Sequence, residues 1–348
     1  MREGWTHNLH AVRRFMTDVL TNARILVTGG AGFIGSNLCD ALLAEGSEVV
    51  CLDNFLTGKR ENIAHLLANP NFTLVEGDIR DLEVCRTAIR GCTHVCHQAA
   101  LGSVPRSIED PKSTNDINIS GSLNVLMSAH EEGIKRFVFA SSSSVYGDEA
   151  TMPKVEDKTG FPLSPYAVTK MVNESYTRVY HQIHGMETIG LRYFNVFGRR
   201  QDPEGQYAAV IPKFVELMLQ SKSPIVFGDG EQTRDFTYVD NVVQMNIHAL
   251  STSNEEAFGQ IFNAACGSRI SINELFSSIR NLLSNYDPSI AQIDATYIGE
   301  RPGDIRHSLA DISKAIRHLG YQPTHDCQLG LEEAMEWYWN ELRGIVVE

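Results

Sequence analysis

The chain has 348 residues and a formal net charge of −13, from 30 lysines and arginines against 43 aspartates and glutamates. Its length suggests two domains or one domain with a large lobe, and 43% hydrophobic residues supply a full core, which excludes a disordered or collagen-like chain. The acidic balance repels polyanions, so we expect no nucleic-acid partner.

The seven cysteines are scattered over the whole chain. An odd, dispersed set differs from the disulfide framework of a small secreted protein and indicates free thiols in a reducing compartment. Residues 1–22 place Leu9, Val12 and Phe15 at helical spacing, which predicts a helical extension packed on the outside of the fold. This segment has no apolar stretch typical of a signal peptide, and no later run approaches the ~18 apolar residues of a membrane helix. We therefore expect a cytoplasmic protein with no membrane partner.

From residue 23 to residue 195, apolar β-branched runs alternate with helical patterns. The runs are ARILVTG, EVVCLDN, FTLVEGDI, THVCHQA, RFVFASS and ETIGLRYFNV. Continuous apolar strands that alternate with helices predict a parallel sheet covered on both faces. The sequence thus predicts an α/β fold with a Rossmann-type doubly wound parallel sheet over residues 23–195, to which a segment near 240–263 returns.

Beyond residue 195 the pattern is interrupted by glycine and proline. Helices are expected near residues 207–220, 240–250, 271–284, 311–319 and 330–343. Ser271 and Glu274 form a Ser-x-x-Glu capping box, and Gly320 stands where a helix end favours a left-handed residue. Residues 196–239 and 264–348 therefore predict a smaller α/β lobe that binds the substrate.

A glycine-rich turn joins the first predicted strand to the first helix. Gly29, Gly32 and Gly35 let backbone amides approach a pyrophosphate, and the following helix directs its positive end at that charge. The second strand ends at Asp53, whose carboxylate is placed to bind both ribose hydroxyls and to repel a 2′-phosphate. This combination predicts NAD rather than NADP. Lys59 and Arg60 argue the other way, but they lie several residues beyond the strand end and are interpreted as a solvated turn.

Three residues further along predict proton transfer. Ser142 follows the fifth strand, and Pro165 suits a first helical position, so Tyr166 and Lys170 stand one turn apart on one helix face. A tyrosine needs its phenolate stabilised to act as a base at neutral pH, and Lys170 together with a cationic nicotinamide would supply that. Tyr166 is then the base, and Ser142 hydrogen-bonds the reacting oxygen.

These motifs together resemble the extended short-chain dehydrogenase/reductase superfamily, from Arg24 onward. Their order along the chain is similar to that of the sugar-nucleotide 4-epimerases. The resemblance implies NAD contacts from Gly29, Gly32, Phe33, Ile34, Gly35, Asp53, Asn54, Asp78, Ile79, Gln98, Ala99, Ala100, Asn118, Tyr166, Lys170 and Tyr193. It implies substrate contacts from Gly102, Ser142, Ser143, Asn195, Ala209, Val210, Arg234, Arg301, Asp304 and Ser308. In such enzymes a sugar C4 is oxidised to a 4-keto intermediate and reduced from its other face.

Two neighbouring activities lack their residues here. Sugar-nucleotide 4,6-dehydratases place an Asp-Glu pair where this chain has Ser143 and Ser144, and UDP-glucuronate decarboxylases generally carry Glu at the second position. The resemblance therefore implies epimerisation rather than elimination or decarboxylation.

The sugar is suggested by three small residues. Galactose-type enzymes commonly carry Lys, Asn and Tyr where this chain has Gly102, Ala209 and Ser308, and a small wall leaves space for an acetamido group. The resemblance is nearest to the UDP-N-acetylglucosamine 4-epimerases, which implies UDP-GlcNAc and UDP-GalNAc as substrates. Dual activity, a UDP-glucose 4-epimerase proper and a non-catalytic NAD or UDP-sugar sensor remain alternatives.

Three further patterns bear on partners. The run from Cys92 to His97 looks like a metal cluster, but its ligands alternate along one strand, so we expect core packing and no metal. Tyr146 lacks a lysine four residues on and is not expected to be the base. The amphipathic segments Ser113–Glu132 and Pro165–His184 resemble the helices that form a four-helix bundle in homodimers of this superfamily.

Overall fold

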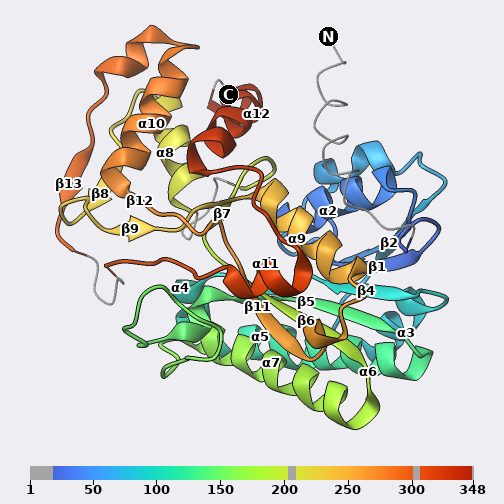
Figure 1. The fold of residues 1–348 in the computed structure, drawn as a ribbon. Coiled ribbons are helices and arrows are strands. Elements are labelled where there is room, and N and C mark those ends of the chain that lie inside the picture. Colours follow the sequence, from blue (N-terminus) through green and yellow to red (C-terminus); the bar gives the residue numbers. More distant parts are fainter. Residues whose placement is uncertain (1–18, 203–208, 301–305, 347–348) are drawn as a thin grey trace.

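A seven-stranded parallel sheet runs through the molecule in the order β11-β6-β5-β4-β1-β2-β3 (Figure 1). The computed structural model describes residues 19–202, 209–300 and 306–346, with side chains up to residue 342. The strands are β1 Arg24–Thr28, β2 Glu48–Asp53, β3 Phe72–Glu76, β4 His94–His97, β5 Arg136–Ser142, β6 Glu187–Tyr193 and β11 Gln260–Ala264. All neighbouring pairs are parallel, which confirms the doubly wound α/β fold.

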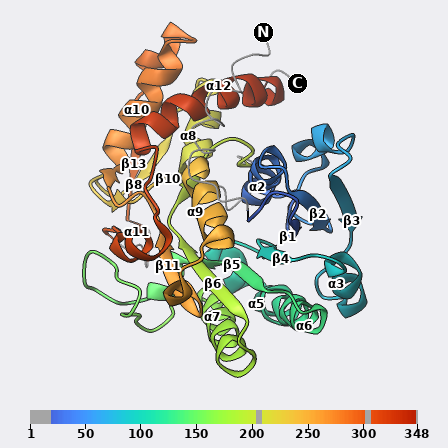
Figure 2. The ribbon, with the colours of Figure 1, turned by 45° about the vertical axis from the view of Figure 1, so that its right-hand side comes forward.

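Helices cover both faces of the sheet. Helices α2 (Phe33–Ala44) and α9 (Val239–Ser251) pack together on one face. On the other face lie α3 (Leu82–Ile89), α6 (Ser122–Glu132) and α7 (Pro165–His184), as Figures 1 and 2 show. Buried apolar side chains fill both layers, so the strands read as continuous hydrophobic runs in the sequence.

Helix α7 begins and ends where its sequence directs. The hydroxyl of Ser164 accepts a hydrogen bond from the Ala167 amide, Pro165 takes the first helical position, and Gly185 ends the helix in the left-handed conformation. The expected helix 113–132 is instead composite: α4 (Val104–Glu109) and α5 (Pro111–Asn115) come first, and the wider turn Asp116–Gly121 leads into α6.

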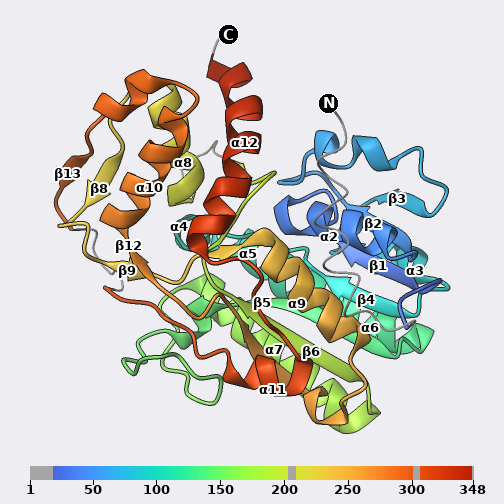
Figure 3. The same cartoon turned by 45° about the horizontal axis from the view of Figure 1, so that its top comes forward.

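The smaller lobe lies at one end of the sheet (Figure 3). Helix α11 Ser313–Leu319, which the sequence had assigned to this lobe, packs instead against β11 and α9 of the main sheet. The helices of the smaller lobe are α8 Val210–Leu219, α10 Ile272–Ser284 and α12 Cys327–Val346. Six short strands lie outside the main sheet. They are β7 Val196–Phe197, β8 Ile225–Phe227, β9 Thr233–Arg234, β10 Thr237–Tyr238, β12 Ile270–Ser271 and β13 Thr296–Ile298. Single-turn 3₁₀ helices are Arg60–Asn62, Ala64–Leu66, Ser143–Tyr146, Glu255–Ala257 and Pro288–Gln292. The capping box of Ser271 and Glu274 is confirmed.

Several sequence expectations need adjustment. Helix α8 begins at Val210 rather than near 207, α11 at Ser313 rather than 311, and α12 at Cys327 rather than 330. Residues 1–18, on which most of the expected N-terminal helix falls, lie outside the described residues, and 19–22 form turns. Within the described ranges, the helices are all too short or too polar to cross a membrane.

Candidate active site

A cavity of about 530 Å³ lies at the carboxyl ends of the central strands. Because parallel strands end at the same edge, the loops after β1, β2, β4, β5 and β6 all reach it. The predicted residues that line it are Gly29, Gly32, Phe33, Ile34, Gly35, Asp53, Asn54, Asp78, Ile79, Gln98, Ala99, Ala100, Gly102, Ser142, Tyr166, Lys170, Tyr193 and Asn195. The structure thus brings the glycine loop and the residues predicted to transfer a proton into one cavity.

The glycine turn has no room for side chains. Gly29 has a φ of +67°, and a Cβ on it would lie 2.8 Å from the Ala99 backbone. A Cβ on Gly35 would lie 2.1 Å from the carbonyl oxygen of Gly29. The loop is therefore closed on itself in front of the N-terminus of α2, which leaves its backbone amides available to a pyrophosphate.

Asp53 stands at the end of β2, buried in the cavity wall. Its two carboxylate oxygens accept hydrogen bonds from the amides of Ala31 (2.9 Å) and Phe55 (2.8 Å). Burial raises the pKa of this carboxyl, and the backbone donors partly offset the rise. Each oxygen keeps a second lone pair, so Asp53 can still accept bonds from the hydroxyls of an adenosine ribose.

The two cations near Asp53 are engaged by other carboxylates. The Lys59 ammonium lies 3.1 Å from Asp202, and the Arg60 guanidinium lies 2.7 Å from Glu76. Neither residue lines the cavity. The chemistry of this end therefore fits NAD, whose ribose carries two hydroxyls, better than a 2′-phosphate.

Tyr166 and Lys170 face the cavity from the first turns of α7. Lys170 is 3% exposed, and its ammonium donates a 2.8 Å hydrogen bond to the Ala140 carbonyl and lies 5.8 Å from the centre of the Tyr166 ring. Burial lowers the pKa of Lys170 to about 8, although Glu174 acts to raise it. Burial raises the pKa of Tyr166, and its hydrogen bond with Ser142 lowers it.

A buried polar network supports the cavity floor. The Tyr193 hydroxyl donates to Gln98 Oε1 at 2.9 Å or to Asn246 Oδ1 at 3.1 Å, and Gln98 Nε2 donates to the same Asn246 oxygen at 3.0 Å. Asn246 comes from α9, more than 50 residues from either partner, and the sequence pattern gave no sign of it. It fixes the two side chains that reach the cavity.

Asn118 lies behind the wall rather than in it. Its side chain accepts from the Leu101 amide at 2.7 Å and donates to the Leu101 carbonyl and to the Thr169 hydroxyl. It is fully buried and does not line the cavity. The structure therefore places this predicted cofactor contact where it positions the loop after β4.

The predicted substrate residues are spread more widely. Asn195 lines the cavity, whereas Ser143, Ala209, Val210, Arg234 and Ser308 do not. Arg234 on β9 and Ser308 lie beside one another, since the Ser308 amide donates to the Thr233 carbonyl at 3.0 Å. The remaining two, Arg301 and Asp304, fall outside the described residues.

Sequence analysis missed several lining residues. They are Leu52, Leu56, Thr57, Gly77, Leu101, Ser103, Ile117, Ala140, Ser141, Val196 and Gln201. Seven of these eleven residues adjoin a predicted residue in the chain, so including the immediate neighbours of each predicted residue would have found them. The other four are Leu56, Thr57, Ala140 and Gln201.

Two expectations about other side chains can be compared with the geometry. Tyr146 does not line the cavity: it is 2% exposed, and its hydroxyl donates to Asn263 Oδ1 at 2.5 Å. His97 is held between the hydroxyls of Thr28 (2.7 Å) and Ser122 (2.8 Å), and burial lowers its pKa to about 3. Both side chains are engaged in the core.

Known proteins resemble the chain over most of its length. Residues 25–265 match the NAD dependent epimerase/dehydratase family. A putative UDP-glucose 4-epimerase of Methanocaldococcus jannaschii is 40% identical over 321 residues, which cover 92% of this chain and 99% of that protein.

Two solved structures show the same arrangement. A UDP-N-acetylglucosamine 4-epimerase from Methanobrevibacter ruminantium, in complex with UDP-N-acetylmuramic acid, is 39% identical, with a TM-score of 0.85 and coverage of 92% of this chain and 99% of that chain. A UDP-glucuronic acid 4-epimerase from Bacillus cereus, in complex with UDP-glucuronic acid and NAD, is 34% identical, with a TM-score of 0.82 and coverage of 91% and 99%. These three proteins are all named 4-epimerases, and their names differ in the sugar.

The closed glycine turn makes a direct prediction. Gly35→Ala should reduce the NAD bound per chain by about tenfold or more, because the added carbon overlaps the Gly29 carbonyl and overpacking costs about 1–3 kcal/mol. Bound NAD is measured by absorbance after release from the purified protein. Gly299→Ala is the matched control, since a Cβ there meets nothing within 4 Å. Normal NAD content in Gly35→Ala would show that this loop does not hold the cofactor.

Proposed function

We propose that this chain, which belongs to the NAD dependent epimerase/dehydratase family, interconverts UDP-N-acetylglucosamine and UDP-N-acetylgalactosamine by epimerisation at C4 through a 4-keto intermediate. The observation that carries the proposal is the single cavity in which Ser142, Tyr166 and Lys170 stand beside the glycine loop and Asp53. The relatives support it, since those compared above are UDP-sugar 4-epimerases.

The chemistry divides between cofactor and protein. The glycine loop and Asp53 would hold NAD, which would supply a reversible hydride acceptor for the C4 hydrogen of the sugar. Tyr166 takes the C4 hydroxyl proton, and Ser142 hydrogen-bonds the same oxygen as it becomes a carbonyl. On the return step Tyr166 gives the proton back. The enzyme therefore ends each turnover with the same protonation state.

Lys170 makes the phenol a competent base. A unit positive charge about 6 Å away, at an effective dielectric of about 20, stabilises a phenolate by roughly 3 kcal/mol, or about two pKa units. This offsets the burial that raises the pKa of Tyr166. The Ala140 carbonyl fixes the ammonium on the side of the cavity wall.

The two residues that follow Ser142 in the chain disfavour other reactions on the same sugar. Ser143 and Ser144 have hydroxyls where elimination or decarboxylation uses carboxylates, and a serine hydroxyl is a far poorer general acid or base than a carboxyl group. Backbone geometry keeps them close to the reacting group, since the Ser144 amide donates to Ser142 Oγ at 3.1 Å.

Space near the sugar supports an N-acetylated substrate. Gly102 lines the cavity, and a Cβ there would meet nothing within 4 Å, so the wall is open at this point. Ala209 and Ser308 are also small. The similar structure from Methanobrevibacter ruminantium carries an N-acetylated sugar nucleotide. The similar protein from Methanocaldococcus jannaschii makes UDP-glucose and UDP-galactose the second candidate pair.

The deciding experiment uses the purified protein without added cofactor. It is incubated separately with UDP-GlcNAc and with UDP-glucose, and the products are identified by NMR. Conversion of the first to UDP-GalNAc is the expected result. Conversion of UDP-glucose alone would favour the second candidate, and no conversion of either would favour a sensor that binds NAD without turnover.

Tyr166→Phe should lower kcat about 10²–10⁴-fold and leave bound NAD unchanged, because only the proton-transfer group is lost. A non-catalytic sensor would be indifferent to this change. In the unmodified protein, a substrate deuterated at C4 should keep its label through epimerisation. Exchange of that deuterium into water would contradict hydride transfer and return within one active site.

Ser308→Tyr should abolish turnover of the N-acetylated pair and preserve that of UDP-glucose and UDP-galactose. The added ring would occupy the space assigned to the acetamido group, and overpacking of this kind costs about 1–3 kcal/mol or more. Rates with both pairs are compared for the same preparation. Equal loss on both would contradict the assignment of Ser308 to the sugar pocket.

We further propose a cytoplasmic homodimer that pairs α6 and α7 with their copies in a four-helix bundle. Val168, Tyr176, Val179 and Ile183 form a stripe along α7 and are 39–70% exposed. Ile183→Glu should shift the protein to a monomer in light scattering, since it buries a charge in that interface. Gln182→Glu, exposed on the same turn, is the control. A dimer that persists in Ile183→Glu would place the interface elsewhere.

A further inference from the structure

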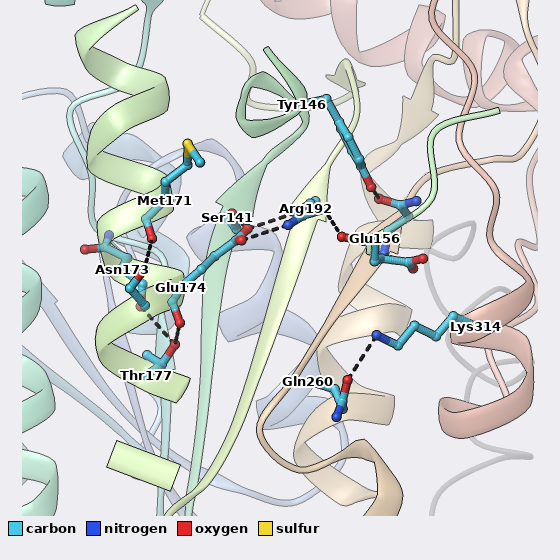
Figure 4. Close-up of polar contacts among 12 residues, drawn as sticks. Ser141, Tyr146, Glu156, Met171, Asn173, Glu174, Thr177, Arg192, Gln260 and Lys314 are labelled. Atoms are coloured by element: carbon cyan, nitrogen blue, oxygen red, sulfur yellow. Dashed lines mark hydrogen bonds and ion pairs between the residues drawn. The ribbon is translucent and has the colours of Figure 1, made fainter. Parts of the chain in front are cut away.

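A buried ion pair lies directly beneath the catalytic residues. Figure 4 shows Glu174 reaching from α7 toward Ser141 on β5 and Arg192 on β6. One Glu174 oxygen accepts from the Ser141 hydroxyl at 2.5 Å and from Arg192 Nε at 2.9 Å, and the other accepts from Arg192 Nη2 at 2.8 Å. The side chains of Arg192 and Glu174 are only 4% and 13% exposed.

The pair sits at one rung of the sheet. Ser141 is the register partner of Arg192, and the next rung joins Ser142 to Tyr193, both of which line the cavity. Glu174 therefore holds together the two strand ends that carry these residues.

The same helix face carries the rest of the site. Tyr166, Lys170 and Glu174 follow one another at intervals of four residues on α7, so they lie in a row against the sheet. Because Glu174 lies one helical turn from Lys170, losing its hydrogen bonds to β5 and β6 would shift the turn of α7 that carries Lys170.

Arg192 is itself fixed on its far side. Its Nη1 donates to the Glu156 carbonyl at 2.9 Å, and its guanidinium lies 4.8 Å from the centre of the Tyr146 ring. These contacts give a structural role to Tyr146, which the sequence analysis did not expect to be the base. Its ring packs against the Arg192 guanidinium and does not line the cavity.

Stability alone does not account for such a pair. Removing two charges from water costs several kcal/mol per ion, and buried pairs are often replaceable by apolar residues without loss of stability. A charged pair beside a catalytic lysine has a second effect, because its carboxylate favours the protonated ammonium.

We propose that Glu174 is a positioning residue for the reaction: through Ser141 and Arg192 it aligns Ser142 with Tyr166, and through its charge it keeps the Lys170 ammonium protonated. This inference rests on the proposed function. The other groups that face Lys170 are Tyr166, the Ala140 carbonyl and His97 of β4, which burial keeps neutral. Arg192 faces Glu174 instead, and Tyr146 faces Arg192.

The test compares pH profiles of kcat for the full-length holoenzyme. Glu174→Gln should move the alkaline limb, where Lys170 loses its proton, to lower pH by roughly one unit and reduce kcat about tenfold. The KM for the UDP-sugar should stay within about threefold, since Glu174 does not touch the cavity. Glu174→Asp keeps the charge and should keep the limb, while the shorter side chain lowers kcat.

The control lies at the opposite end of the same strands. Glu187 on β6 pairs with its register partner Arg136 on β5, with side chains 18% and 5% exposed. Glu187→Gln breaks an ion pair of similar burial. It should lower the melting temperature and leave the alkaline limb of the kcat profile unmoved. If Glu174→Gln does not fold, Glu174→Gln with Arg192→Met removes both charges and should move the limb in the same direction but by less, because Arg192, which disfavours the ammonium, is removed as well.

An unshifted profile in the folded Glu174 variant, or the same shift in Glu187→Gln, would overturn the inference. If the unmodified enzyme is active, either of these two results contradicts only the role of Glu174 and leaves the proposed function intact. An unmodified enzyme inactive on both sugars would overturn the function first, and this inference with it.

Discussion

The packing of α7 across β5 and β6 is the constraint on which the site depends. It buries the Lys170 ammonium against the Ala140 carbonyl and brings the Tyr166 ring within 5.8 Å of that charge. A lysine on an exposed helix face would be screened by water and would do little for a phenolate. Burial makes the same charge effective, and it also lowers the pKa of Lys170 to about 8, close to the point where the charge would be lost. The fold must therefore supply something that keeps the ammonium charged.

The cofactor end of the cavity depends on close backbone approach rather than on charge. The chain carries a net charge of −13, yet it must hold a dinucleotide that is itself anionic. The glycine turn offsets this repulsion because its backbone amides and the positive end of α2 attract phosphate without adding a cation. The cations near Asp53 are meanwhile engaged by Asp202 and Glu76. This arrangement favours NAD over NADP, because the Asp53 carboxylate is placed for the ribose hydroxyls and the backbone amides of the glycine turn are placed for the phosphates.

The parts of the site that are local in the sequence were predictable from it. Gly29 to Gly35 and Asp53 are defined by the strands they follow, and Pro165, Tyr166 and Lys170 are set by helical spacing. The parts that join distant elements were not. Asn246 contacts Gln98 and Tyr193 only because α9 returns to the sheet, and Arg192 meets Glu174 only because two strands and a helix converge. Asn118 shows the same limit: its place in the motif order suggested the cofactor, but its hydrogen bonds go to Leu101 in the loop after β4 and to Thr169 on α7.

The charges beneath the cavity also favour the ionisation of Tyr166 that the proposed mechanism requires. Lys170, Glu174 and Arg192 together carry one net positive charge in a region largely shielded from solvent. An isolated phenolate there would be costly, but a phenolate beside this cluster brings its sum to zero, so ionisation of Tyr166 removes a buried net charge instead of creating one. Glu174 without Arg192 would cancel Lys170 completely and leave the phenolate unbalanced. Arg192 without Glu174 would disfavour the ammonium. The proposed ionisation of Tyr166 therefore needs both charges of the Glu174–Arg192 ion pair. Glu174 lies one helical turn from Lys170, so it acts on the lysine without occupying the cavity that the sugar would enter.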